Sequence, residues 1–141
     1  MNSGWELVYC LRLPEPTILH QQFVRMRDHE QQRYREQLCW WFVDANDGTP
    51  SAPLHESWVH VERHSAKPFP LHADLIGGLK PLLDVLVCPR LRNSHGLGFI
   101  VDDAPQYLLQ LTAESLQAKP QQGYSVVCIY RPTTSARRLA A

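Results

Sequence analysis

Two short segments of the chain carry side chains suited to holding a metal ion beside a phosphate group. Residues 70–84 lead into a helical pattern, and residues 99–105 lead from a short apolar run into a turn. Carboxylates that meet at one place repel one another unless a cation lies between them. Oxygen ligands suit Mg²⁺ or Mn²⁺, and Mg²⁺ usually keeps waters and a phosphate substrate beside a few protein ligands. If the two segments pack together, the side chains that converge are His72 and Asp74 from the first and Asp102 and Asp103 from the second.

Each of these residues also has an ordinary structural explanation. Asp74 fits the N-cap of a helix, and the acidic pair 102–103 fits a turn held by side-chain-to-backbone hydrogen bonds. A lone histidine such as His72 is more often a surface imidazole than a metal ligand. Lys80 and Asp84 are an i,i+4 pair worth about a few tenths of a kcal/mol. Spacing alone favours these structural explanations.

The elements that must position these residues follow from hydrophobic periodicity. The predicted strands are residues 6–13, 58–63, 108–114 and 124–130, and the predicted helices are residues 19–42 and 75–87. The order β-α-β-α-β-β, with the last two strands as a hairpin, predicts an α+β domain. We expect a small mixed sheet with two main helices on one face. Pro81 predicts a late start or a kink in the second helix, because its ring clashes with the preceding turn.

Length and composition bound the class of protein. The chain has 141 residues, of which 44% are hydrophobic. This is enough for one compact domain, expected over residues 1–131 with a flexible tail over 132–141. No apolar run approaches the roughly 20 residues of a membrane span, and the first residues lack signal-peptide features. We therefore expect a cytoplasmic protein with no membrane partner.

Charge and cysteine content are less specific. The 14 basic and 14 acidic side chains balance, which argues mildly against a nucleic-acid partner, because phosphate contacts favour a basic excess. Four arginines of the first helix are mixed with acidic residues, so a solvated, salt-bridged face is favoured over a phosphate-contacting one. The four cysteines are scattered without a CxxC pair, which favours buried thiols over a structural zinc or a disulfide framework.

The two segments, in order, resemble the signature of the RusA family of Holliday-junction resolvases, many of which phages and prophages encode. The family pattern is Asp-x-Asp-Asn-Leu, a helix with a lysine and then an aspartate one turn later, and a hydrophobic pair leading into Asp-Asp. Residues 71–84 and 100–103 follow this order, with Lys80 and Asp84 at the helix positions. The likeness covers about residues 58–111, and the N-terminal strand and helix fit only in general order.

The resemblance implies a small α+β homodimer that cuts branched DNA with Mg²⁺ or Mn²⁺ in a bacterial or phage-infected cell. It implies Asp74, Asp103 and Lys80 as catalytic residues. The implied metal ligands are Asp74, Asp102, Asp103 and His72. The residues expected to contact DNA are Arg25, Arg27, Arg33 and Arg35, at least two of them beside the cleft that holds the acidic residues.

Two positions depart from the family pattern. The first aspartate of the pattern is His72 here, and the asparagine after the second is missing. A count back from Lys80 without a gap instead aligns Asp74 with the first aspartate and Ile76 with the second. A neutral imidazole binds Mn²⁺ but is a poor ligand for Mg²⁺. Three functions stay open: an active nuclease, a degenerate relative that binds DNA or a protein without cleavage, and an unrelated α+β binding module.

Overall fold

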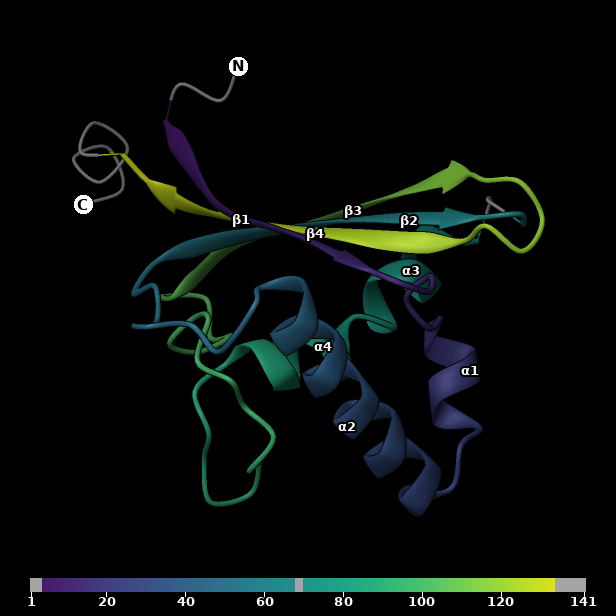
Figure 1. Cartoon of the computed structure of the whole chain (residues 1–141), viewed down its shortest axis with the longest axis horizontal. Coiled ribbons are helices and arrows are strands. Elements are labelled where there is room, and N and C mark those ends of the chain that lie inside the picture. The colour runs from purple at the N-terminus through teal and green to yellow at the C-terminus, as the bar shows by residue number, and fades with distance from the viewer. Residues whose placement is uncertain (1–3, 68–69, 134–141) are drawn as a thin grey trace.

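The computed structural model describes residues 4–67 and 70–133, which form a four-stranded sheet with helices on one face (Figure 1). The strands are β1 (Trp5–Leu13), β2 (Ser57–Ser65), β3 (Leu108–Gln117) and β4 (Tyr124–Pro132). Their order across the sheet is β1-β4-β2-β3. Strand β4 is antiparallel to β1 and β2, whereas β2 and β3 are parallel. The predicted α+β class and mixed sheet are confirmed, and residues 134–141 of the predicted tail lie outside the described residues.

The expected hairpin between the last two strands was wrong. Strand β3 pairs with β2 and forms an edge, whereas β4 crosses over and inserts between β1 and β2. The reason is burial: three consecutive residues of β4, Val127, Cys128 and Ile129, are buried, as in the middle of a sheet. A near-continuous apolar run is typical of a central strand. Strand β3 carries no fully buried residue and suits the edge.

Both predicted helices are divided in two. The first becomes α1 (His20–Val24) and α2 (Asp28–Ala45), and the second becomes α3 (His72–Gly77) and α4 (Lys80–Leu86). Pro81 lies in the first turn of α4, where its missing N–H costs no hydrogen bond. All four helices lie on the same side of the sheet (Figure 1). In the described part of the chain, none of them is both long enough and apolar enough to cross a membrane.

Gly78, between α3 and α4, packs against the chain that precedes α1. A Cβ atom there would lie 1.9 Å from the carbonyl oxygen of Ile18, so only glycine allows the chain before α1 to pass this close. The α1–α2 break falls at residues 25–27, where the Glu30 side chain accepts a hydrogen bond from the backbone N–H of Arg27 (3.0 Å). This bond satisfies one of the free N–H groups at the start of α2.

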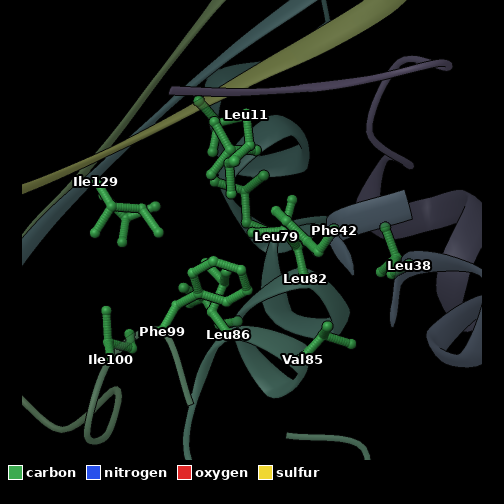
Figure 2. Packing of buried hydrophobic residues seen from close by; sticks show 14 of the residues in the cluster. Leu11, Leu38, Phe42, Leu79, Leu82, Val85, Leu86, Phe99, Ile100 and Ile129 are labelled. Carbon is green, nitrogen blue, oxygen red and sulfur yellow. The ribbon is translucent and has the colours of Figure 1, made fainter. Parts of the chain in front are cut away.

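The hydrophobic core fills the space between the inner face of the sheet and helices α2 and α4 (Figure 2). Phe99 is fully buried and packs edge-on against Tyr9 (5.0 Å between ring centroids) and near Phe42 (5.9 Å). The other main contributors, from the sheet, from α2 and from α4 with its flanking residues, are Leu11, Leu13, Val59, Val61, Val127, Ile129, Leu38, Leu79, Leu82 and Leu86. In the part of the chain that the structure describes, no helix lies over the opposite face of the sheet (Figure 1).

Candidate functional site

The pair Asp102–Asp103 is held in place by the core segment just before it. The backbone of Phe99 accepts a hydrogen bond from Leu54 (2.9 Å), Ile100 donates to Leu86 (3.1 Å) and Val101 donates to Leu54 (3.0 Å). Since these bonds tie the segment to the end of α4 and to the loop before β2, the two aspartates emerge at a fixed point. The sequence predicts a turn over residues 102–105; the structure has a bend at residues 103–104 and a turn at 105–107, which leads into β3.

Lys80, at the start of α4, joins the two sequence segments. Its Nζ lies 3.1 Å from Oδ1 of Asp84 and 3.2 Å from Oδ2 of Asp103. Asp84 is in turn paired with Nε of Arg35 from α2 (3.2 Å). The two segments therefore meet at the lysine, whereas the expected convergence of His72 and Asp74 with the aspartate pair is not seen among the described residues.

Arg90 completes this group of charges from the loop after α4. Its Nη2 lies 2.7 Å from Oδ1 of Asp102 and 3.6 Å from Oδ1 of Asp103. Asp102 Oδ1 also accepts a hydrogen bond from the backbone N–H of Asp103 (2.8 Å), so the local turn explanation holds for this residue as well. We call the whole group the acidic network; it consists of Arg35, Lys80, Asp84, Arg90, Asp102 and Asp103.

The ionisation of the acidic network follows from these contacts. Partial burial opposes charge on Asp103, but the hydrogen bond and positive charge of Lys80, with help from Asp102, lower the pKa of Asp103 below its ordinary value. For Lys80, partial burial again opposes charge, but hydrogen bonds to Asp84 and Asp103 raise its pKa. At neutral pH the network therefore contains an ionised Asp103 beside a protonated Lys80.

Asp74 contacts a different part of the molecule, and His72 is exposed. Oδ1 of Asp74 accepts a hydrogen bond from the backbone N–H of Gln21 in α1 (2.8 Å), and its charge acts on buried Arg63 of β2. His72 is exposed in the first turn of α3. Asp74 thus lies inside α3 and caps a neighbouring helix rather than its own. Within the described residues, the four expected metal ligands do not form a group of three donors within 4.8 Å of one another.

The four arginines expected to contact DNA are spread over α2 and the α1–α2 junction. Arg35 alone among them has an ion pair in the acidic network. Arg33 lines a separate pocket of about 350 Å³ with Glu15, Tyr34 and Trp41, and both Arg25 and Arg27 are exposed at the α1–α2 junction. A polar pocket of about 210 Å³ adjoins the network and is lined by Arg35, Asp84, Arg92, Asn93, His95 and Gln32.

The sequence interpretation missed Arg90, which is the direct partner of both aspartates. It lies in the segment 88–98, which reads as a polar loop, and no periodic pattern marks it. Its proximity to the acidic pair depends on the hydrogen bonds between Arg90 and Asn93 that fold this loop back (2.8 and 3.0 Å). Asn93 also donates from Nδ2 to the carbonyl oxygen of Asp84 (2.7 Å), which fixes the loop to α4.

The fold and this network define an α+β protein with a paired-charge site where a helix start, a turn and a loop meet. Comparison with models of known protein families gives no match for the chain. Comparison with curated protein sequences gives no match either. The assignment of a function therefore depends on the residues themselves.

Proposed function

We propose that this chain is a metal-dependent endodeoxyribonuclease of the RusA type, which hydrolyses phosphodiester bonds in branched DNA. One observation carries the proposal: Lys80 of the first segment lies 3.2 Å from Asp103 of the second, although 23 residues separate them in the chain. The sequence resemblance pairs these two residues in one catalytic site. The backbone bonds of the 97–101 segment to α4 and the residue after it bring the two segments together, and the ion pair adds a specific contact between these two residues.

The donor chemistry of the aspartate pair fits Mg²⁺ or Mn²⁺. Asp102 and Asp103 are adjacent, partly exposed carboxylates, and two carboxylates with waters and phosphate oxygens suit these hard cations. The lowered pKa of Asp103 keeps it ionised and ready to bind a cation. A bound ion would polarise the phosphate and acidify a water molecule. Arg90 forms ion pairs with both aspartates. Binding of a metal ion would therefore require that Arg90 move away or that it share the two carboxylates with the ion.

The basic residues of the network have a separate task, which is to bind the phosphate backbone. Lys80 has a raised pKa and stays charged, and its side chain is 61% exposed, so Nζ is accessible to a phosphate oxygen. Arg35 and Arg92 line the adjoining pocket. Charge-assisted hydrogen bonds from such donors orient a phosphate and stabilise the charge that develops during hydrolysis.

Asp74 and His72 stay predicted members of the site. The contacts of Asp74 lie toward α1 and β2, so its participation requires that α3 change its orientation when DNA or metal binds. Asp74→Asn tests this directly. A variant that cleaves as well as the wild-type chain would remove Asp74 from the mechanism and leave Asp102 and Asp103 as the acidic centre.

The main experiment uses the purified full chain, a labelled four-way junction and a matched linear duplex, each in Mg²⁺, in Mn²⁺ and in EDTA. We expect metal-dependent cuts in the junction that disappear in Asp103→Asn. Asp47→Asn is the matched control, because Asp47 lies in a loop with a positive φ of 56° that asparagine tolerates. An equal loss of junction cleavage in Asp103→Asn and in Asp47→Asn, or cleavage that persists in EDTA, would contradict the proposal.

His72→Asp tests the departure from the family pattern. His72 is exposed at the start of α3, where an added carboxylate is compatible with the helix. If the imidazole limits the site, this change increases cleavage in Mg²⁺ more than in Mn²⁺. An unchanged or lower rate in Mg²⁺ would show that residue 72 does not limit activity.

A second function, DNA binding without cleavage, has its own supporting observation. Three carboxylates of the network are matched by three cations of the protein itself, so a closed, metal-free network is stable in its own right. A degenerate relative would bind a four-way junction in fluorescence anisotropy with equal affinity in EDTA and in Mg²⁺, and would not cut it. The homodimer that the resemblance implies matches the two-fold symmetry of such a junction, and sedimentation at micromolar concentration tests it.

A further inference from the structure

The face of the sheet away from the helices carries a second group of ionisable residues. Along β2, alternate residues point to this face, as strand geometry requires; they are Trp58, His60, Glu62 and His64. The parallel register places Glu62 directly opposite Glu114 of β3. His60, Glu62 and Glu114 each offer one ligand atom, and these three atoms lie within 4.8 Å of one another. We call these three residues the outer-face cluster.

The facing glutamates need a positive partner. Like charges directly opposite on neighbouring strands destabilise a sheet. Among the described residues, neither glutamate has an ion pair with a lysine or an arginine. Their partners are imidazoles: Nε2 of His60 lies 3.2 Å from Oε1 of Glu114, and Nε2 of His64 lies 3.0 Å from Oε1 of Glu62. An imidazole, unlike a lysine, can release its proton and coordinate a metal instead.

The ring of His60 is already oriented for this role. Its Nδ1 lies 2.7 Å from Oγ1 of Thr112, which also accepts a hydrogen bond from Nε1–H of Trp58 (2.8 Å). A hydroxyl oxygen can accept two hydrogen bonds, so Thr112 can accept one from the indole N–H and one from an N–H at Nδ1. That tautomer leaves the lone pair of Nε2 directed at the glutamates. Metal-binding histidines typically have such a hydrogen-bonded partner on the other ring nitrogen.

We propose that the outer-face cluster is a Zn²⁺ site that links β2 to the edge strand β3. The 3.2 Å between Nε2 of His60 and Oε1 of Glu114 is close to the roughly 3.3–3.5 Å between two ligands bound at about 2.0–2.1 Å in a tetrahedral site. One imidazole with two carboxylates suits Zn²⁺ better than Mg²⁺, which prefers oxygen ligands and waters. The site uses no cysteine, so the cysteine spacing that argues against a structural zinc does not bear on it.

The site would stabilise a part of the sheet that has few other supports. Among the described strands, β3 pairs with β2 alone, and none of its residues is fully buried. A ligand that binds only the folded state raises the stability of that state. Zn²⁺ across His60, Glu62 and Glu114 therefore reduces the opening of the edge strand. The same strand begins just after the Asp102–Asp103 turn, but the proposal is independent of nuclease activity.

The test is Zn²⁺ binding by isothermal titration of the untagged, chelator-treated full chain. We expect one equivalent of Zn²⁺ to bind the wild-type protein at micromolar concentration, and Glu114→Gln and His60→Gln to weaken binding at least about tenfold. Asp103→Asn serves as the control, because it removes a carboxylate of the acidic network and leaves the outer-face cluster intact. Co²⁺ supplies a second readout, since nitrogen and oxygen ligation of Co²⁺ gives visible absorption bands.

Clear outcomes separate this site from the proposed nuclease site. Binding that survives in Asp103→Asn but is lost in Glu114→Gln supports the outer-face cluster. Binding that is lost in Asp103→Asn and retained in Glu114→Gln overturns it, as does the absence of Zn²⁺ binding to the wild-type chain below about 100 μM. Should His60→Gln fail to fold, as circular dichroism would reveal, Glu114→Gln decides, because the Glu114 side chain is 49% exposed.

Discussion

Carboxylates gather at two places in the described part of this molecule, and the two places differ in how their charge is balanced. The acidic network lies among helices and loops, where Lys80, Arg35 and Arg90 match its three aspartates. The outer-face cluster lies on regular strands, where its two glutamates face each other and contact imidazoles. Its ligand atoms also lie closer together as a set of three.

The difference shows what a permanent cation does for a group of acids. Lysine and arginine stay charged at neutral pH, so a metal ion must compete with them for the carboxylates. An imidazole can lose its proton and is itself a common metal ligand, so it does not exclude a metal ion in this way. The acidic network is therefore stable without an ion, whereas the outer-face cluster gains from one. The following predictions test this contrast, beginning with the largest expected effect.

Phe99→Ala should disrupt the acidic network and spare the outer-face cluster. Phe99 is fully buried, and its segment anchors Asp102 and Asp103. Its truncation should cost about 3–5 kcal/mol in the free energy of unfolding, measured by urea denaturation. The comparison variant is Trp40→Ala, whose side chain is 72% exposed and which should change stability by less than about 0.5 kcal/mol. Similar values for both variants would be incompatible with the packing described here.

Asp84→Asn should lower the free energy of unfolding by about 1.5 kcal/mol. This is the low end of the contribution of a hydrogen bond to a charged group, and we expect the low end because the Lys80 side chain is largely exposed. The carboxylate of Asp84 is shared by Arg35 and Lys80, so its loss leaves both cations with one partner fewer. Chemical denaturation in low and high salt measures the effect, and we expect a smaller loss in high salt because ions screen the exposed pair. A loss independent of salt would assign the effect to packing.

The acidic network also predicts a pH dependence. The pKa of Asp103 is lower in the folded chain than its ordinary value of 3.8. Its ionised form therefore stabilises the folded state above about pH 3.8, and this contribution is lost as pH falls through the lower folded value. Lys80→Met should raise the pKa of Asp103, because the variant keeps the burial that raises this pKa and loses the hydrogen bond and positive charge that lower it. Carbonyl-detected NMR titration of the two proteins measures the shift, and an unchanged pKa would rule out Lys80 as its cause.

Glu114→Gln should have the smallest effect. In the metal-free chain it removes one of two facing charges, so stability should stay constant or rise by about 0.2–1 kcal/mol. With Zn²⁺ present the wild-type chain should become the more stable of the two, because it binds the ion more tightly than the variant. Thermal denaturation with and without Zn²⁺ gives both values. A destabilised metal-free variant would mean that the pair with His60 contributes more than the repulsion costs.

Local pattern in the sequence was enough to predict the elements but not their arrangement. Strand 6–13 and strand 58–63 each lie within an observed strand, and the common face for the helices followed from their apolar stripes. The breaks within the helices were not fully predicted. Pro81 indicated the break between α3 and α4. The close approach of Ile18 to Gly78 could not be predicted, because no local pattern in the sequence connects these two segments.

The candidate sites show the same limit. Lys80 and Asp103 meet as the order of motifs indicated, because a helix start and a turn carry them at fixed ends of buried segments. The position of Asp74 could not be predicted in this way. Asp74 and Lys80 lie in two separate helices, α3 and α4, and not in one regular helix that would fix their relative positions. The alternation of His60 and Glu62 is visible in the sequence, but the register that places Glu114 opposite depends on a long parallel crossover.

The position of β4 has a consequence for how this chain is made. Strand β4 is synthesised after the other three strands, yet among the described strands it alone joins β1 to the rest of the sheet. While the ribosome still holds residues 124–132, β1 has no partner strand and one edge of β2 has unpaired backbone groups. Such edges favour contacts with other chains. Completion of the sheet is therefore a late event that brings the two ends of the described chain together.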